Sequence, residues 1–178
     1  MLLKDFHEIM GSEIISTTGG LFAGLMLTFA TNKIEMIPAL LILFPGFMEM
    51  RGNISGTLSA RLSAGLHVGA FKKEYDKNKI VKGNAVASMV LVILLSLVLG
   101  LVAYYVSTEF FGITNANIII VALVAGILSN VIEVPLTIFI TFWLFRHGHD
   151  PNNIMGPYVT TAGDIISVVS LLIAISLV

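Results

Sequence analysis

Apolar residues fall into five long stretches along the chain, and short polar segments separate them. A helix needs about 20 residues to cross a membrane core about 30 Å thick, and the stretches are long enough for this. The pattern therefore predicts an all-α integral membrane protein with five transmembrane helices. These helices are expected over residues 14–30, 37–69, 84–106, 117–145 and 155–178.

The second stretch, residues 37–69, is too long and too polar for one regular span. It contains Pro45, Gly52 and Gly56, which are residue types that weaken a helix. Opened backbone survives at membrane depth where it lines a cavity or is buried in protein. We therefore expect a broken second helix, in which two helical pieces flank opened backbone near residues 49–56.

The N-terminal segment has a different pattern from the five stretches. Leu2, Phe6 and Ile9 recur at helical spacing among charged and polar residues. This spacing predicts a short helix over residues 1–12 that lies at the membrane interface, with a frayed amphipathic tail as the alternative. Residues 13–178 then form a single five-helix transmembrane domain.

The composition agrees with a lipid environment. Of the 178 residues, 56% are hydrophobic and 12% are charged, whereas soluble domains are about half apolar and about a quarter charged. The sequence has no basic patch with interleaved aromatic residues, which argues against nucleic-acid binding. The absence of cysteine excludes disulfides, thiolate metal sites and a cysteine nucleophile.

The basic residues between the stretches are distributed unequally. Residues 71–82 contain five lysines, and an excess of lysine and arginine marks the cytoplasmic side of a membrane protein. Alternation of the spans places Lys4 and Arg146 on the same side and Lys33 on the other. We therefore expect a multi-pass protein of the cell membrane with a cytoplasmic N-terminus and an external C-terminus.

Three acidic residues fall near the middle of the predicted spans. Glu49 and Asp164 lie about 18 Å and about 14 Å from the start of their stretches, at about 1.5 Å per residue. Glu133 lies near the centre of the fourth stretch. A carboxylate at the bilayer centre costs about 2.5–3.5 kcal/mol on insertion scales, so such residues usually mark a pathway. Asn53, beside Gly52, joins them if the second stretch opens there.

Structural roles compete with this interpretation. Glu49 could form a buried ion pair with Arg51 or Arg61. Glu133 could pair with Arg61 or bond to backbone groups that lack another partner. Asp164 has no basic partner nearby in the sequence, and small or hydroxyl residues surround it. Asp164 is therefore the strongest candidate for a cation site.

Two segments carry specific motifs. One is PGFMEMRGNISGTLSARLSAGLHVG at residues 45–69, which contains a Gly-Asn pair and an Ala-Arg-Leu-Ser element. The other is DPNNIMGPYVTTAGDIIS at residues 150–167, which contains an Asp-Pro loop, a Gly-Pro helix start and Thr-Thr-x-x-Asp. Both segments, in this order, resemble the membrane domain of MgtE-type magnesium carriers and of the eukaryotic solute-carrier proteins related to them.

The resemblance implies roles for particular residues. Asp164 corresponds to the acidic residue that faces a hydrated magnesium ion on the pore axis. Thr160, one turn earlier, would offer an oxygen atom, and Gly52 and Asn53 would lie near the same site. The other two midplane acids have no counterpart in the resemblance and are included because of their depth. The candidate metal-site residues are thus Asp164, Thr160, Asn53, Gly52, Glu49 and Glu133.

The chain differs from these carriers in two ways. MgtE carriers have a large cytosolic sensor region, whereas about a dozen residues precede the first predicted span here, so we expect a short form without that sensor. The solute-carrier relatives contain two copies of the membrane unit, and this chain contains one. Because five spans can hardly enclose a pore, we expect a parallel homodimer with two copies of Asp164 across its two-fold axis.

The predicted function is transport of a divalent cation, with Mg²⁺ as the first candidate. No organic cofactor and no enzymatic activity are expected. Mg²⁺ takes oxygen ligands and keeps several of its waters, and the candidate residues offer oxygen atoms. One alternative is a proton- or sodium-coupled transporter of another divalent cation. Another is an intramembrane aspartyl protease, which needs two aspartates in the membrane. The position of Asp76 among lysines argues against that enzyme.

Overall fold

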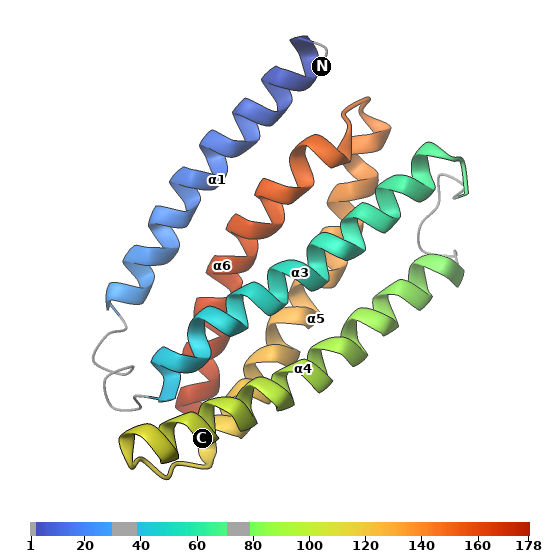
Figure 1. The fold of residues 1–178 in the computed structure, drawn as a ribbon. Coiled ribbons are helices and arrows are strands. Elements are labelled where there is room, and N and C mark those ends of the chain that lie inside the picture. The colour runs from blue at the N-terminus through green and yellow to red at the C-terminus, as the bar shows by residue number, and fades with distance from the viewer. Residues whose placement is uncertain (1–2, 30–38, 71–78) are drawn as a thin grey trace.

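The computed structural model describes residues 3–29, 39–70 and 79–178, and the regular secondary structure in these ranges is α-helical. The all-α prediction is therefore confirmed. Leu2, Lys33, Asp76 and the three lysines between residues 71 and 78 lie outside the described residues. The helices are α1 (Leu3–Phe29), α3 (Ala39–His67), α4 (Lys79–Phe111), α5 (Asn117–Arg146) and α6 (Pro151–Leu177) (Figure 1).

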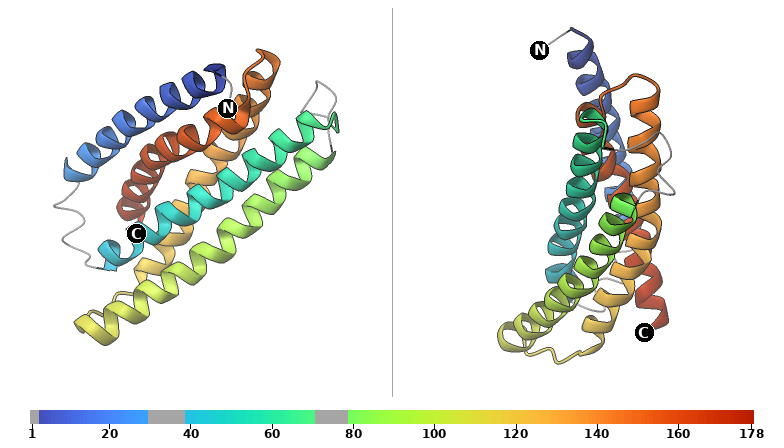
Figure 2. Two further views of the ribbon diagram at one scale, coloured as in Figure 1. Left: turned by 45° about the horizontal axis from the view of Figure 1, so that its top comes forward. Right: turned by 90° about the vertical axis from the view of Figure 1, so that its right-hand side faces the viewer.

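Helices α3 and α5 pack against each other, and each of them also packs against α4 and α6. Helix α1 lies at the side and packs mainly against α6 (Figures 1 and 2). Its buried residue is Ala23, whereas α3 has buried residues from Ala39 to Leu66. The core therefore lies along one face of α3, and polar side chains on this inner face are held away from solvent.

Three of the described helices, α4, α5 and α6, are long and apolar enough to cross a membrane. Helix α4 also exposes large apolar side chains along its length, among them Leu94, Val98 and Leu101. An exposed apolar surface of this extent is stable in contact with lipid. These helices indicate a membrane protein. Helices α1 and α3 are more polar, so their passage through the membrane stays a prediction.

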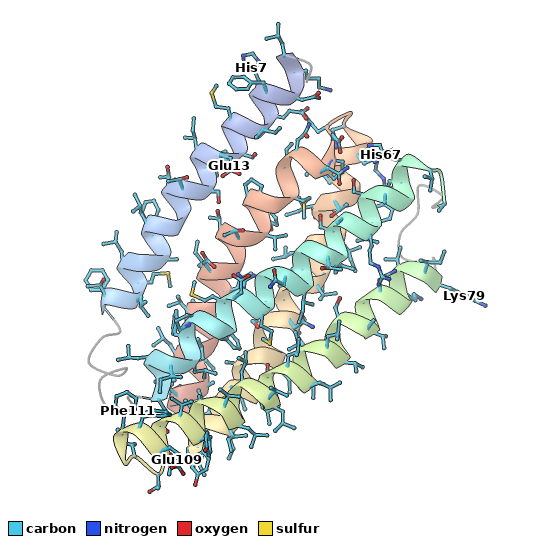
Figure 3. All side chains as sticks on the ribbon, viewed as in Figure 1. His7, Glu13, His67, Lys79, Glu109 and Phe111 are labelled. Atoms are coloured by element: carbon cyan, nitrogen blue, oxygen red, sulfur yellow. The ribbon has the colours of Figure 1, made fainter. Side chains whose placement is uncertain are left out.

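The two ends of the bundle carry different residues. His67 and Lys79 lie at the end that holds the N-terminus, whereas Glu109 and Phe111 lie at the opposite end (Figure 3). The C-terminus also lies at that opposite end (Figure 2). Lys79, at the start of α4, is thus on the same end as the start of α1.

The predicted break in the second helix is wrong. Helix α3 is continuous from Ala39 to His67, with Pro45 inside it. The two glycines of residues 49–56 keep ordinary helical backbone, because neither has a positive φ. Packing of a buried face outweighs their cost of about 1 kcal/mol each, and a continuous helix satisfies its own backbone groups. That face continues through the segment at Phe47, Met50, Ile54 and Leu58.

The N-terminal residues do not form a separate short helix. Residues 3–29 make one continuous helix, so the predicted boundary near residue 12 is not a helix end. Gly11 lies within α1, and a single glycine costs a helix only about 1 kcal/mol relative to alanine. The position of the first twelve residues at the membrane interface stays a prediction.

Glycines allow the helices to approach each other closely. A Cβ atom on Gly100 of α4 would lie 2.8 Å from the Cα atom of Ile119 on α5. A Cβ atom on Gly19 of α1 would lie 2.0 Å from the Cγ2 atom of Thr161 on α6. Gly100 thus permits close packing of α4 on α5, and Gly19 leaves room for Thr161 between α1 and α6. Helices α5 and α6 supply carboxylates to the site described next.

Candidate functional site

A groove between α3 and α6 brings together most of the residues that the sequence predicts for a cation site. The groove has a volume of about 490 Å³ and is also lined by Arg51. Glu133, the sixth predicted residue, is instead buried on α5, with an exposed fraction of 3%. The five predicted residues that line the groove are Glu49, Gly52, Asn53, Thr160 and Asp164.

The helical repeat places these side chains on the sides of α3 and α6 that form the groove. Glu49 and Asn53 are four residues apart, as are Thr160 and Asp164, so each pair shares one face of its helix. Nδ2 of Asn53 donates a hydrogen bond to Oε1 of Glu49 at 3.1 Å. Oγ1 of Thr160 donates to the carbonyl oxygen of Gly156, also at 3.1 Å. The groove thus presents carboxylate, amide and hydroxyl groups.

Arg51 lies at the back of the groove and joins two of the predicted acidic residues. Its side chain has an exposed fraction of 1%. Nη1 donates a hydrogen bond to the carboxylate of Glu133 and another to the carbonyl oxygen of Val159 at 3.3 Å. Nη2 donates to Oδ1 of Asp164 at 3.2 Å. One guanidinium group from α3 therefore bridges carboxylates from α5 and α6.

These contacts correct two expectations about ion pairs. Asp164 has a basic partner, and Glu133 pairs with Arg51 instead of Arg61. Arg61 donates a hydrogen bond to Oδ1 of Asn84 at 3.2 Å. Arg51 is 82 positions from one of its partners and 113 from the other. A search for partners nearby in the sequence cannot find pairs of this kind.

Gly163 is a further site residue that the sequence did not single out. A Cβ atom at this position would lie 1.4 Å from Nη1 of Arg51 and 2.0 Å from its Cζ atom. The guanidinium group therefore occupies the space that a side chain at residue 163 would need. Glycine on α6 is what allows Arg51 to reach between the two carboxylates.

The cluster of Arg51, Glu133 and Asp164 has a net charge of -1 when all three groups are charged. It is surrounded by low-dielectric protein, where a charge acts more strongly than in water. Asp164 has a side-chain exposed fraction of 19%, against 4% for Glu133. The excess negative charge would attract a cation, and Asp164 is the carboxylate of this cluster that lines the groove.

The groove does not offer a cage of protein ligands. Across residues 3–29, 39–70 and 79–178, no three His, Cys, Asp or Glu side chains come close enough together to hold a metal ion. Mg²⁺ gives up its waters reluctantly and is commonly held by one or two carboxylates through a partly retained water shell. The arrangement therefore suits a hydrated divalent cation better than a dehydrated one.

The site lies within a region that matches a known protein family. The MgtE divalent cation transporter model matches residues 44–174. This range contains the whole lining of the groove and the three charged residues of the cluster. The chain belongs to the MgtE family of divalent cation transporters. Members of this family are transporters and not enzymes, which excludes the protease alternative.

Solute carriers are also similar to this MgtE-family chain, as the two sequence segments predicted. It is 26% identical to solute carrier family 41 member 3 of Rattus norvegicus, over 93% of this chain and 40% of that protein. It is 23% identical to solute carrier family 41 member 2 of Mus musculus, over 90% of this chain and 29% of that protein. The chain thus spans less than half the length of these relatives. No solved structure matches it significantly.

A second polar cluster of this MgtE-family chain lies at the end of the bundle that holds the N-terminus. Nδ1 of His149 lies 2.9 Å from Oε1 of Glu8, and Nδ2 of Asn153 donates to Oε2 of Glu8 at 3.0 Å. Nζ of Lys4 donates to the carbonyl oxygen of Gly148 at 2.6 Å. These contacts attach the first turns of α1 to the start of α6.

This attachment is expected to depend on pH. Burial acts to raise the pKa of Glu8, but hydrogen bonds from Asn153 and His149 and the charge of Lys4 outweigh it, so the pKa is lowered. A carboxylate with a lowered pKa stabilises the folded protein fully at pH values above its unfolded-state pKa of 4.5. This stabilisation is lost as the pH falls through the pKa of Glu8 in the folded protein. Glu8→Gln should therefore lower the melting temperature by about 2–4 °C at pH 7 and by less in acid.

Thermal unfolding in detergent at pH 7 and below pH 4.5 measures this difference. Glu13→Gln is the matched control, because Glu13 is an exposed carboxylate on the same helix. A Glu8→Gln protein that melts with the wild type at pH 7 would contradict the expectation.

Proposed function

We propose that this chain transports Mg²⁺ across the cell membrane, with the groove between α3 and α6 as its cation pathway. The proposal depends above all on Asp164, which lines the groove and accepts a hydrogen bond from Arg51 behind it. Carboxylates inside membrane proteins usually mark ion pathways. Membership of a divalent cation transporter family supports the same conclusion.

The residues of the groove suit a magnesium ion that keeps most of its water. Asp164 attracts the ion, and the side chains of Thr160, Asn53 and Glu49 accept hydrogen bonds from its waters. Gly52 leaves room for the water shell, because no heavy atom lies within 4 Å of the position that a Cβ atom would take. A site of this kind binds weakly enough to release the ion, as conduction requires.

A second copy of the chain completes the pathway in this proposal. Glu49, Asn53 and Thr160 are exposed in the single chain, and polar groups that face lipid at membrane depth are costly. Two-fold pairing is the commonest symmetry of protein oligomers. A parallel dimer that pairs the two grooves would remove these groups from lipid. It would also place two copies of Asp164 around one divalent ion.

Cysteine crosslinking tests the dimer. Thr160→Cys should form a crosslinked dimer in native membranes with a short bifunctional maleimide, because Thr160 lines the groove that the partner would cover. Leu94→Cys is the control on the exposed apolar surface of α4 and should stay monomeric. The chain has no cysteine of its own, so the background is low. A crosslink at residue 94 but not at residue 160 would contradict the proposed interface.

The proposed topology places the N-terminus in the cytoplasm and the C-terminus outside. Lys79 and Glu109 lie at opposite ends of the bundle (Figure 3). In intact cells, Lys79→Cys should react with membrane-permeant maleimides only, whereas Glu109→Cys should also react with impermeant ones. Labelling in the reverse order would invert the orientation.

Transport itself is tested with purified protein in liposomes. Uptake of Mg²⁺, Mn²⁺, Co²⁺ and Ca²⁺ is measured with and without a pH or sodium gradient, and protein-free liposomes serve as the control. The proposal expects Mg²⁺ uptake that needs neither gradient. Uptake of another divalent cation that occurs only with a pH or sodium gradient would instead support the coupled transporter. Absence of uptake for all four ions would overturn the proposed function.

A further inference from the structure

Arg51 is an unexpected neighbour for a cation site. Its guanidinium group is permanently charged under physiological conditions, it is almost fully buried, and it lines the same groove as Asp164. A fixed positive charge at this position repels any cation that approaches Asp164. The presence of a buried arginine beside a cation pathway therefore requires an explanation.

We propose that Arg51 is a tethered cation that competes with the transported divalent ion for Asp164, and that Glu133 holds Arg51 while the ion is bound. The inference rests on the proposed role of Asp164 in cation transport. It makes Arg51 and Glu133 a pair that sets the affinity of the site, although Glu133 does not itself line the groove.

The hydrogen bonds of Arg51 are divided between the two carboxylates. Nη1 donates to Glu133 and to the carbonyl oxygen of Val159, while Nη2 donates to Asp164. Neither carboxylate therefore receives the two parallel hydrogen bonds that arginine forms in its strongest pairs. The guanidinium group of Arg51 therefore bonds to both carboxylates, and it forms a bidentate pair with neither of them.

Each member of the Arg51–Glu133 pair retains an unused polar atom. Among the described residues, Oε2 of Glu133 and Nε of Arg51 are buried and have no hydrogen-bond partner with regular geometry, and the hydroxyl group of Ser55 lies close to Glu133. When a cation takes over Asp164, the guanidinium group can offer a second N–H group to the free oxygen of Glu133. Glu133 thus has the acceptor capacity that the alternative state of Arg51 needs.

The surroundings of Arg51 permit such an exchange. Gly163 places no side chain between the guanidinium group and α6. Asp164 is the more exposed of the two carboxylates, and Glu133 lies deeper in the protein. An ion in the groove therefore reaches Asp164 first, while Arg51 keeps a buried partner on the side away from the ion.

The charges explain what the exchange does. With Arg51 beside Asp164, the attraction of Asp164 for a second cation is reduced. With Arg51 transferred to Glu133, Asp164 becomes available to the divalent ion. The return of Arg51 to Asp164 then helps the ion to leave. The pair would prevent the site from holding a divalent cation too tightly for transport.

Two substitutions with opposite expected effects test this competition. Glu133→Gln keeps the shape but removes the charge that holds Arg51, so Arg51 should remain on Asp164 and the Kd for Mg²⁺ should rise by about tenfold or more. Arg51→Gln added to Glu133→Gln removes the competitor, so the Kd should fall back to the wild-type value or below it. The double variant removes both charges of the deeply buried pair, and Asp164, which loses its partner, is partly exposed in the groove, which favours folding.

Binding of MgCl₂ to the full chain in detergent is measured by titration calorimetry for wild type, Glu133→Gln and the double variant. Asp164→Asn is measured beside them and should lose Mg²⁺ binding. A purely structural role for the pair predicts changes in melting temperature but equal Kd values in the three proteins, and that result would overturn the inference. A double variant that binds more weakly than wild type would also overturn it.

The Asp164→Asn measurement separates the two proposals. If Asp164→Asn loses binding while the other variants bind like wild type, the competition is wrong and the proposed function stands. If Asp164→Asn binds Mg²⁺ like wild type, the site itself is wrong, and the competition fails with it.

Discussion

Asp164→Asn is expected to lower the rate of divalent-cation uptake by at least about 100-fold while the protein stays folded. A unit charge about 4 Å from an ion contributes about 4 kcal/mol per unit of ionic charge at an effective dielectric constant of about 20. Loss of the carboxylate charge therefore removes most of the attraction in the groove. Asparagine keeps a carbonyl oxygen that can still accept the hydrogen bond from Nη2 of Arg51, so the melting temperature should change little.

The measurement is the initial rate of Mg²⁺ uptake into liposomes, together with thermal unfolding of the same preparation. Glu13→Gln is the matched control, because it neutralises an exposed carboxylate of α1 that is not part of the groove. The control should transport like wild type. Normal uptake by folded Asp164→Asn would show that this carboxylate is not on the ion pathway.

Gly163→Ala is expected to lower the melting temperature by about 10 °C or more. The added methyl group would lie 1.4 Å from Nη1 of Arg51, so the guanidinium group must leave its place. Its departure leaves Glu133 buried without its partner, and breaking a buried ion pair from one side costs about 3–5 kcal/mol. In a chain of this size each kcal/mol corresponds to about 2–4 °C.

Gly156→Ala is the matched control for this substitution. Gly156 lies on the same helix, and no heavy atom is within 4 Å of the position that its Cβ atom would take. Alanine should be neutral or slightly stabilising there, because it is the better helix former. The test compares the melting temperatures of both variants with that of the wild type in the same detergent. Equal melting temperatures would mean that Arg51 can move aside at little cost.

The sequence predicted the helices and most of the groove for physical reasons that can be named. Apolar stretches of membrane length mark α4, α5 and α6, and carboxylates at membrane depth are too costly to occur by chance. Glu49 and Asp164 were found because of their depth in the predicted spans. Gly52, Asn53 and Thr160 were found because their motifs resemble those of MgtE carriers.

The break in α3 was predicted from residue types alone, and this is why it failed. Glycine and proline weaken a helix by a small and local amount, whereas the packing of Phe47, Met50 and Ile54 depends on the neighbouring helices. The pairing of Arg51 with Glu133 and Asp164 was missed for a similar reason. The packing of three helices decides which of their faces meet, and this packing cannot be predicted from a single sequence.

The side-on position of α1 has a consequence for the order in which the protein is assembled. Helix α1 precedes the other described helices in the chain, but its main packing partner, α6, follows them. The contacts of Lys4 and Glu8 with residues 148–153 span more than three quarters of the chain. Long-range contacts of this kind close a large loop and form late. Helix α1 can therefore dock only after α6 has been synthesised, so its docking is a late step among the described helices.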